Sequence, residues 1–262
     1  MKTIVIGAGY WGKNYIRELG HYCVGAIDIN PSRLKEAENS FGVKGYAFSD
    51  KWPEFDAAII ATPPDTHIGV AKPILKKGKY VLIEKPFAIS VEEALQLRKY
   101  KDKVMAGHIY LYHPEVENLR KTIEEVPIDH VFSRRTNAGP VRDWQDAMWD
   151  LAAHDISIFN YIFKHVPHAC DVIKSRDWAL LKLDYVAVNA LIYVSWLGGP
   201  KTRTIELVPA DRDERIVFDD LKVALEVSPM RRMLDDFLSG QWDEKCSFDA
   251  AIDVINVLES SS

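Results

Sequence analysis

The first part of the chain alternates short apolar runs with amphipathic stretches of helical period. Ile68, Ala71 and Leu75 show that period, because residues three or four apart share one face of a helix. The apolar runs predict strands near 2–6, 22–27, 43–47, 56–61, 79–83 and 103–106. Strands that alternate with helices predict an α/β domain over 1–107, with a doubly wound parallel sheet.

The alternation stops after residue 107. Helices are expected near 114–125 and 147–163 on either side of a strand near 128–136, and short strands then follow near 179–185, 189–196, 203–208, 215–218 and 222–227. Two last helices are expected near 229–239 and 247–259. We therefore expect a second domain over 108–262, an α+β domain with a mostly antiparallel open sheet, whose final helices can pack back on the first domain.

The first strand runs directly into a complete G-x-G-x-x-G turn, Gly7-Ala8-Gly9-Tyr10-Trp11-Gly12. Such a turn needs one glycine to turn tightly, one to let the backbone approach a pyrophosphate, and one to pack the helix against the strand. Asp28 ends the second strand, at the position where a carboxylate binds the adenosine ribose, and Arg33 follows nearby. A dinucleotide site is predicted, with NAD favoured and NADP as the alternative, because Asp28 would repel a 2′-phosphate.

Composition and charge exclude several other classes of function. The net charge of −5 and the lack of a basic run between aromatic residues argue against nucleic acid or an anionic membrane as a partner. The three cysteines lack C-x-x-C spacing and no H-E-x-x-H motif occurs, so we expect neither a disulfide framework nor a metal site. A strand follows Met1 at once and no apolar run reaches membrane-spanning length, which favours a cytoplasmic protein.

Two polar groups directly follow predicted parallel strands, at the edge where α/β sheets bind ligands. Thr62-Pro63-Pro64 with His67 follows the fourth strand; His67 lies near the dinucleotide or caps and packs locally. Glu84-Lys85-Pro86 follows the fifth strand, where the Lys85 ammonium can bind a substrate oxygen or serve as an ordinary surface charge.

Two further groups lie near and beyond the predicted domain junction. His108 and Tyr110 line a cleft or pack the seam between the domains. Asp150 and His154 are four residues apart and share one helix face, as a carboxylate–imidazole pair for acid–base work or as an ordinary surface pair.

Taken together, the glycine turn, Ala61-Thr62-Pro63-Pro64 with His67, Glu84-Lys85-Pro86 and Asp150 with His154 resemble the Gfo/Idh/MocA oxidoreductase family in order and spacing. The resemblance implies an NAD(P)-binding Rossmann domain over 1–107 and a substrate-binding and oligomerisation domain over 108–262. It implies hydride transfer between NAD(P) and a hydroxyl or carbonyl carbon of a sugar, nucleotide sugar or cyclitol. It also implies a homo-oligomer, a dimer or tetramer, formed through the second sheet.

The resemblance also assigns roles to single residues. Lys85 would contact the reacting oxygen, His154 would act as general acid and base, and Asp150 would position the substrate. The cofactor would be bound by Gly7, Gly9, Tyr10, Trp11, Gly12, Asp28, Arg33, Thr62, Pro63, His67, Glu84 and Lys85, and the substrate by His108, Tyr110, Arg142, Asp150 and His154.

Within the family, the segments 107–114 and 149–156 are most similar to dehydrogenases of UDP-linked amino sugars. Arg142 would then bind a phosphate or carboxylate, or else belong to a solvated strand edge. Many members are longer after the position of His154, so shortened loops are expected here. Two alternatives remain: a non-catalytic NAD-binding sensor or partner subunit, and a sugar oxidoreductase or isomerase that holds NAD tightly.

Overall fold

The computed structural model describes residues 1–138, 145–197, 200–211, 213–219 and 225–260. The chain divides into two compact units: unit 1 comprises Met1–Ile109 and Val227–Ile252, and unit 2 comprises Tyr110–Glu226 and Asp253–Ser262. Among the described helices, none is both long and apolar enough to cross a bilayer.

Unit 1 contains a six-stranded parallel sheet in the order β3-β2-β1-β4-β5-β6. Its strands are β1 (Thr3–Ile6), β2 (Cys23–Ile27), β3 (Gly45–Tyr46), β4 (Ala57–Ile60), β5 (Tyr80–Glu84) and β6 (Val104–Gly107). The order reverses between β1 and β4, so right-handed crossovers place the helices on opposite faces of the sheet. The strands are almost wholly buried, which explains why their sequences are continuous apolar runs. The strand order confirms the predicted doubly wound α/β fold.

The helices of unit 1 come from both ends of the chain. After α1 (Tyr10–Leu19), α2 (Pro31–Phe41), α3 (His67–Lys76) and α4 (Val91–Leu95), the chain leaves the unit and returns with α7 (Pro229–Ser239). Helix α7 packs against α1, where the Arg231 guanidinium donates a hydrogen bond to the Glu18 carbonyl oxygen at 2.8 Å. Helix α8 (Phe248–Ser260) begins in unit 1 and ends in unit 2.

Unit 2 is built on a second six-stranded sheet in the order β12-β11-β7-β10-β9-β8. The strands are β7 (Ile128–Thr136), β8 (Ala169–Lys174), β9 (Trp178–Asp184), β10 (Asn189–Ser195), β11 (Thr202–Pro209) and β12 (Ile216–Asp219). Only the β7–β10 pair among these strands is parallel, so the mostly antiparallel sheet is confirmed.

Two expectations about strands in unit 2 need correction. Strand β8 was not predicted, because it is an edge strand in which no residue is fully buried and the apolar alternation is weak. The strand expected over 222–227 lies partly outside the described residues, and Leu225–Val227 do not form a strand.

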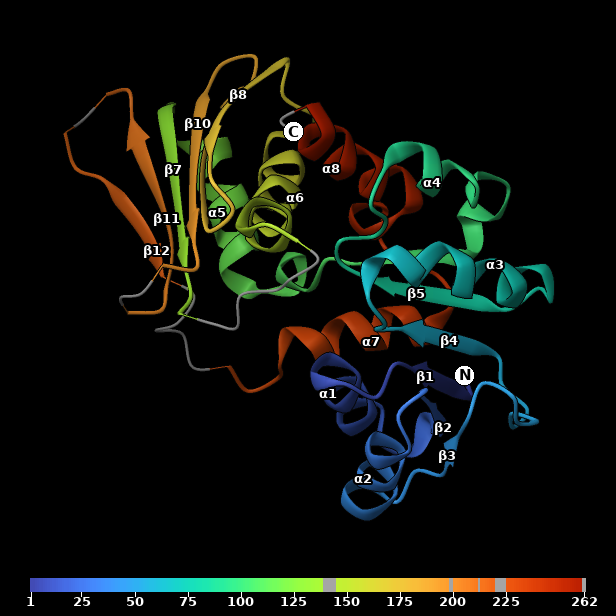
Figure 1. The fold of residues 1–262 in the computed structure, drawn as a ribbon. Coiled ribbons are helices and arrows are strands. Elements are labelled where there is room, and N and C mark those ends of the chain that lie inside the picture. The colour runs from blue at the N-terminus through green and yellow to red at the C-terminus, as the bar shows by residue number, and fades with distance from the viewer. Residues whose placement is uncertain (139–144, 198–199, 212, 220–224, 261–262) are drawn as a thin grey trace. The chain divides into compact units, whose positions relative to one another are not determined.

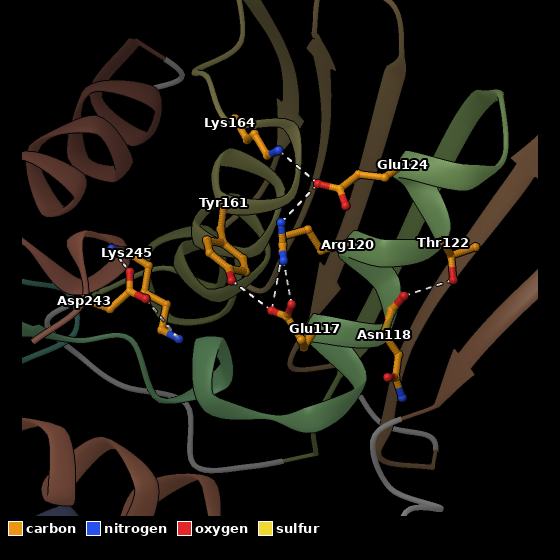
Figure 2. A network of polar contacts seen from close by, with 9 residues as sticks. All are labelled: Glu117, Asn118, Arg120, Thr122, Glu124, Tyr161, Lys164, Asp243 and Lys245. Carbon is orange, nitrogen blue, oxygen red and sulfur yellow. Dashed lines mark hydrogen bonds and ion pairs between the residues drawn. The ribbon is translucent and has the colours of Figure 1, made fainter.

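Helices α5 (Pro114–Glu125) and α6 (Ala153–Phe163) cover one face of this sheet (Figure 1). A π-helical turn, Met148–Ala152, leads directly into α6, so the single helix expected over 147–163 has two parts. Polar contacts join the two helices (Figure 2): Tyr161 donates a hydrogen bond to Glu117 at 2.9 Å, and Glu124 pairs with both Arg120 and Lys164. Such partly exposed pairs add little stability, but they fix the alignment of α5 against α6.

Candidate active site

The glycine turn lies at the carboxyl edge of the first sheet, where the strand order reverses. Gly7 has a φ of +93°, and a Cβ atom there would lie 2.6 Å from the Ala61 carbonyl oxygen. A Cβ at Gly12 would lie 1.7 Å from the carbonyl oxygen of Gly7. Both positions therefore require glycine for packing inside the protein itself.

Gly9 differs from the other two glycines. The only described atom within 4 Å of a Cβ placed there is Nη1 of Arg33, at 3.9 Å. Gly9 is also the N-cap of α1, which has no side-chain cap and no acidic residue in its first turn. Open space over the backbone and N–H groups at a helix N-terminus fit the pyrophosphate of a dinucleotide.

Asp28 lies at the end of β2 and is 3% exposed. Its Oδ2 accepts a hydrogen bond from the Ala8 N–H at 2.7 Å, and its Oδ1 accepts one from the Asn30 N–H at 2.8 Å. Nη1 of Arg33 is 3.6 Å from Oδ2. The carboxylate therefore holds the glycine turn in place, a role that the sequence analysis did not foresee, and each oxygen keeps a lone pair for a ribose hydroxyl.

The loop after β4 is joined to the loop after β5 by His67. This side chain is fully buried, with Nε2 2.8 Å from the Thr62 carbonyl oxygen and Nδ1 3.1 Å from the Pro86 carbonyl oxygen. Burial lowers the pKa of His67, so the ring is neutral and donates its one N–H to one of these oxygens at a time. The structure thus shows His67 linking two loops at the carboxyl edge.

Glu84 is the last residue of β5, and Lys85 directly follows it. The Tyr15 hydroxyl donates a 2.5 Å hydrogen bond to Oε1 of the buried Glu84, and the Lys85 N–H donates to Oε2 at 2.9 Å. Burial and the carboxylate raise the pKa of Tyr15 well above its usual value, so the hydroxyl keeps its proton. Tyr15 was missed from sequence because it reads as an ordinary core position of α1, and it fixes the carboxylate beside the half-buried Lys85.

His108 directly follows β6. Its ring is 3% exposed, and within the described part of the chain neither ring nitrogen has a hydrogen-bond partner. Burial lowers the pKa of His108 to about 4, so the imidazole is neutral at physiological pH. Both ring nitrogens are buried, so the expectation that His108 binds substrate, with packing as the alternative, stays a prediction.

Asp150 and His154 belong to unit 2 and are both buried. Asp150 lies in the π-helical turn, and its Oδ2 accepts a hydrogen bond from Nε1 of Trp196 at 3.1 Å. His154 lies in the first turn of α6 and meets the Tyr110 ring edge-on, with the ring centroids 4.7 Å apart. Single π-helical turns occur often at functional sites, because they re-aim side chains relative to a regular helix. Sequence analysis gave no sign of Trp196.

Asp155, next to His154, has a separate role. It receives two hydrogen bonds from the Arg135 guanidinium, at 2.8 and 3.0 Å, and one from the Ser133 hydroxyl at 2.6 Å. This buried ion pair fastens α6 to β7 and orients the turn that carries His154. Arg142 lies outside the described residues, which also contain no group of three or more side chains able to hold a metal ion.

A family model of oxidoreductases with an NAD-binding Rossmann fold, Gfo/Idh/MocA, matches residues 1–107. The match covers the whole of the first sheet of unit 1. Residues 1–107 form an NAD-binding Rossmann fold, in agreement with the open space over Gly9 and the uncapped start of α1.

The chain is also similar to individual members of this family. It is 30% identical to UDP-N-acetylglucosamine 3-dehydrogenase of Acidithiobacillus ferrooxidans over 60% of this chain and 53% of that protein. It is 24% identical to inositol 2-dehydrogenase of Rhodococcus jostii over 62% of this chain and 50% of that protein. The matched part thus spans about half the length of these curated relatives.

The resemblance in fold extends over the whole chain. The crystal structure of the WlbA dehydrogenase from Bordetella pertussis, in complex with NADH and UDP-GlcNAcA, gives a TM-score of 0.82 at 18% identity. The alignment covers 99% of this chain and 94% of that chain. At this identity the comparison shows the fold of both units and nothing about the substrate.

Proposed function

We propose that this protein is an NAD-dependent dehydrogenase that acts on a sugar, a nucleotide sugar or a cyclitol, with NADP as the alternative cofactor. The supporting observation is the arrangement at the carboxyl edge of the first sheet. There the glycine turn that fits a pyrophosphate shares an edge with Lys85, whose loop is fixed by the buried Glu84 and Tyr15.

Bound NAD supplies the acceptor or donor of the hydride. In the proposed reaction Lys85 donates a hydrogen bond from its ammonium group to the reacting oxygen and stabilises the negative charge that develops there. His154 takes the hydroxyl proton during oxidation and returns it during reduction. We assign this proton to Nε2, because Nδ1 of His154 is buried.

Trp196 and Tyr110 of unit 2 orient the side chains of Asp150 and His154. Trp196 fixes Oδ2 of Asp150, and we assign to this carboxylate the positioning of a substrate hydroxyl. Tyr110 packs against His154 and limits the rotation of its ring. NAD preference over NADP rests on Asp28, whose position is fixed by Ala8 and Asn30.

The test is a spectrophotometric screen of nicotinamide reduction, with NAD and NADP against cyclitols, free sugars, sugar acids and nucleotide sugars. With the best substrate, Lys85→Met and His154→Asn should each lower kcat by about 10²–10⁴-fold, the usual contribution of acid–base and electrostatic groups. NAD affinity, measured by calorimetry, should change little in His154→Asn.

Lys99→Met is the matched control, because Lys99 is an exposed lysine of unit 1 away from the carboxyl edge. It should retain wild-type turnover. Near-normal turnover in both Lys85→Met and His154→Asn would rule out the mechanism. NAD binding without turnover on any substrate class would favour the sensor or partner-subunit alternative, and cofactor that survives gel filtration would favour the enzyme with tightly held NAD.

We also propose that the protein self-associates through the open face of the second sheet. Strand register places Phe132, Leu191 and Glu206 in one cross-strand row and Leu180, Tyr193 and Ile173 in the next, all on the same face. Phe132 is 38% and Ile173 67% exposed. A continuous, partly apolar sheet face of this kind is typical of a surface that another copy of the chain covers.

A further inference from the structure

Tyr15 joins the middle of α1 to the end of β5. Its side chain has no exposed surface, and its hydroxyl donates the 2.5 Å hydrogen bond to Oε1 of Glu84. A hydroxyl that donates to an ionised carboxylate forms a shorter and stronger bond than two neutral groups form. Because the phenol is neutral, it holds the carboxylate in place without cancelling its negative charge.

Glu84 passes this contact on to Lys85. Its Oε2 accepts the backbone N–H of Lys85 at 2.9 Å, so one carboxylate binds the phenol through one oxygen and the lysine backbone through the other. Glu84 is 5% exposed, and a buried charge that loses a hydrogen-bond donor is costly. The direction in which the chain leaves β5 at Lys85 therefore depends on Tyr15.

The neighbouring strand leaves room for this arrangement. Gly107 of β6 lies opposite Glu84 in the parallel register. A Cβ atom at Gly107 would lie 3.2 Å from Cα of Glu84, 3.1 Å from the Ile83 carbonyl oxygen and 3.5 Å from the Tyr15 hydroxyl oxygen. Glycine at this position thus lets α1, β5 and β6 close around the Glu84 carboxylate.

The helix that carries Tyr15 also begins at the proposed pyrophosphate site. Gly9 is the N-cap of α1, and Tyr15 follows within the same helix of 10 residues. A short helix of this kind moves as one element, because each turn is hydrogen-bonded to the next. One helix therefore sets the position of the glycine turn and of the carboxylate that holds Lys85.

We propose that Tyr15 is a positioning residue of the reaction, which acts through Glu84 to hold Lys85 where its ammonium group contacts the reacting oxygen. The proposal rests on the proposed function and adds to it a residue that, being fully buried, touches neither substrate nor cofactor. Reacting groups must be held within about 0.5 Å of their productive geometry, so the loss of one support lowers turnover.

The first measurement needs neither substrate nor NAD. Hydrogen exchange of the Lys85 amide, followed by NMR, should become about ten- to a hundredfold faster in Tyr15→Phe, the range that corresponds to the loss of one charge-assisted hydrogen bond. Tyr100→Phe is the matched control, because Tyr100 lies in the turn Arg98–Lys103 before β6, at the amino edge of the sheet. It should exchange as wild type. Unchanged exchange in Tyr15→Phe would overturn the proposal.

The second measurement is turnover of the best substrate from the spectrophotometric screen. Tyr15→Phe should lower kcat by about ten- to a hundredfold, whereas the Kd of NADH, measured by fluorescence, should stay close to that of wild type. In a Lys85→Met background, Tyr15→Phe should cause little further loss of kcat, because residues that act as a unit are not additive. Tyr100→Phe should retain wild-type turnover in both backgrounds.

Glu84→Gln tests the same link from its other partner, and it takes the place of Tyr15→Phe if urea unfolding shows that Tyr15→Phe does not fold. A glutamine side chain has one acceptor oxygen and one donor NH₂ group, so it cannot accept both hydrogen bonds. Glu84→Gln should therefore lower kcat, and Tyr15→Phe added to it should lower kcat little further.

Equal falls in kcat from Tyr15→Phe in wild type and in Lys85→Met would overturn the proposal, because Tyr15 would then act on the fold as a whole. Normal kcat in Tyr15→Phe together with slow turnover in Lys85→Met would also overturn it and would leave the proposed function intact. Normal turnover in Lys85→Met would instead contradict the proposed mechanism. Faster exchange of the Lys85 amide in Tyr15→Phe would in that case still support the link through Glu84.

Discussion

At the residue scale, the buried polar side chains of unit 1 differ in whether other groups of the protein form hydrogen bonds with them. Glu84 is held by the Tyr15 hydroxyl and a backbone N–H, and Asp28 by two backbone N–H groups. His108 is the contrasting case, because no described group bonds its buried ring. A buried imidazole in this state stays neutral in the native protein, which makes it a source of pH-dependent stability.

The predicted pH effect of His108 has a definite sign. The unfolded chain takes up a proton at His108 below the usual histidine pKa of about 6.5, whereas in the folded protein burial holds its pKa at about 4. The unfolded state therefore binds more protons in this window, and stability falls as the pH drops from about 6.5 to about 4, by up to ~1.4 kcal/mol per pH unit.

Urea unfolding at several pH values measures this effect. The free energy of unfolding of His108→Phe should fall less steeply than that of wild type in the acidic window. His21→Phe, which replaces an exposed histidine of the same unit, should follow the wild-type slope. A His108→Phe slope equal to that of wild type would show that the ring is charged or solvated in the native state.

At the element scale, each functional group is positioned by the end of a strand or the start of a helix. The glycine turn joins β1 to α1, and the buried pair of Arg135 and Asp155 joins β7 to α6. Charge pairs of this kind contribute mainly by holding one arrangement, because desolvation offsets much of their attraction. In this protein the arrangement they hold is the direction of the turn that carries His154.

The glycine turn gives a prediction that separates packing from ligand binding. Gly9→Ala should fold, because its backbone has φ −73° and a Cβ there meets only the Arg33 side chain, at 3.9 Å. It should nonetheless bind NADH at least about tenfold more weakly, since the methyl group occupies the space for the pyrophosphate. Gly12→Ala should unfold the unit, because its Cβ would overlap the Gly7 carbonyl oxygen.

Urea unfolding and fluorescence titration with NADH measure the two effects separately. Gly69→Ala is the control, because this helical glycine of α3 has no described atom within 4 Å of the added Cβ. It should bind NADH normally and gain up to ~1 kcal/mol of stability from the better helix propensity of alanine. Wild-type NADH affinity in Gly9→Ala would mean that the cofactor does not approach the turn.

At the scale of the whole molecule, the second sheet has one face covered by α5 and α6 and one face of mixed apolar and charged residues. In the proposed oligomer this open face lies against another copy of the chain. Phe132→Glu together with Leu180→Lys should convert the assembly to monomers, because the two charges would be buried in the contact. Light scattering after gel filtration measures the mass directly.

Val186→Glu provides the matched control for this experiment, since Val186 is 71% exposed in the turn between β9 and β10 and lies outside the β-sheet rows. Its mass should equal that of wild type. A wild-type chain that is monomeric at micromolar concentration would contradict the proposed contact, as would a double variant of unchanged mass.

The sequence by itself determined the architecture of unit 1 and the position of its nucleotide turn. Buried parallel strands are continuously apolar, and a backbone that approaches a phosphate closely requires glycine. Short stretches of sequence therefore predict both the sheet and the glycine turn. The mostly antiparallel second sheet was also foreseen, although its edge strand β8 was not, because an edge strand buries too little to show a clear alternation.

Only the tertiary structure decided which side chains act together. Tyr15 and Glu84 are 69 residues apart and Asp150 and Trp196 are 46 apart, and no local pattern connects them. Arg203 likewise lies opposite Arg135 only because of the register between β11 and β7. A shift of that register by one residue would move every side chain of the shifted strand to the other face of the sheet. Local patterns set the backbone of this protein, whereas long-range register and burial set the chemistry of its side chains.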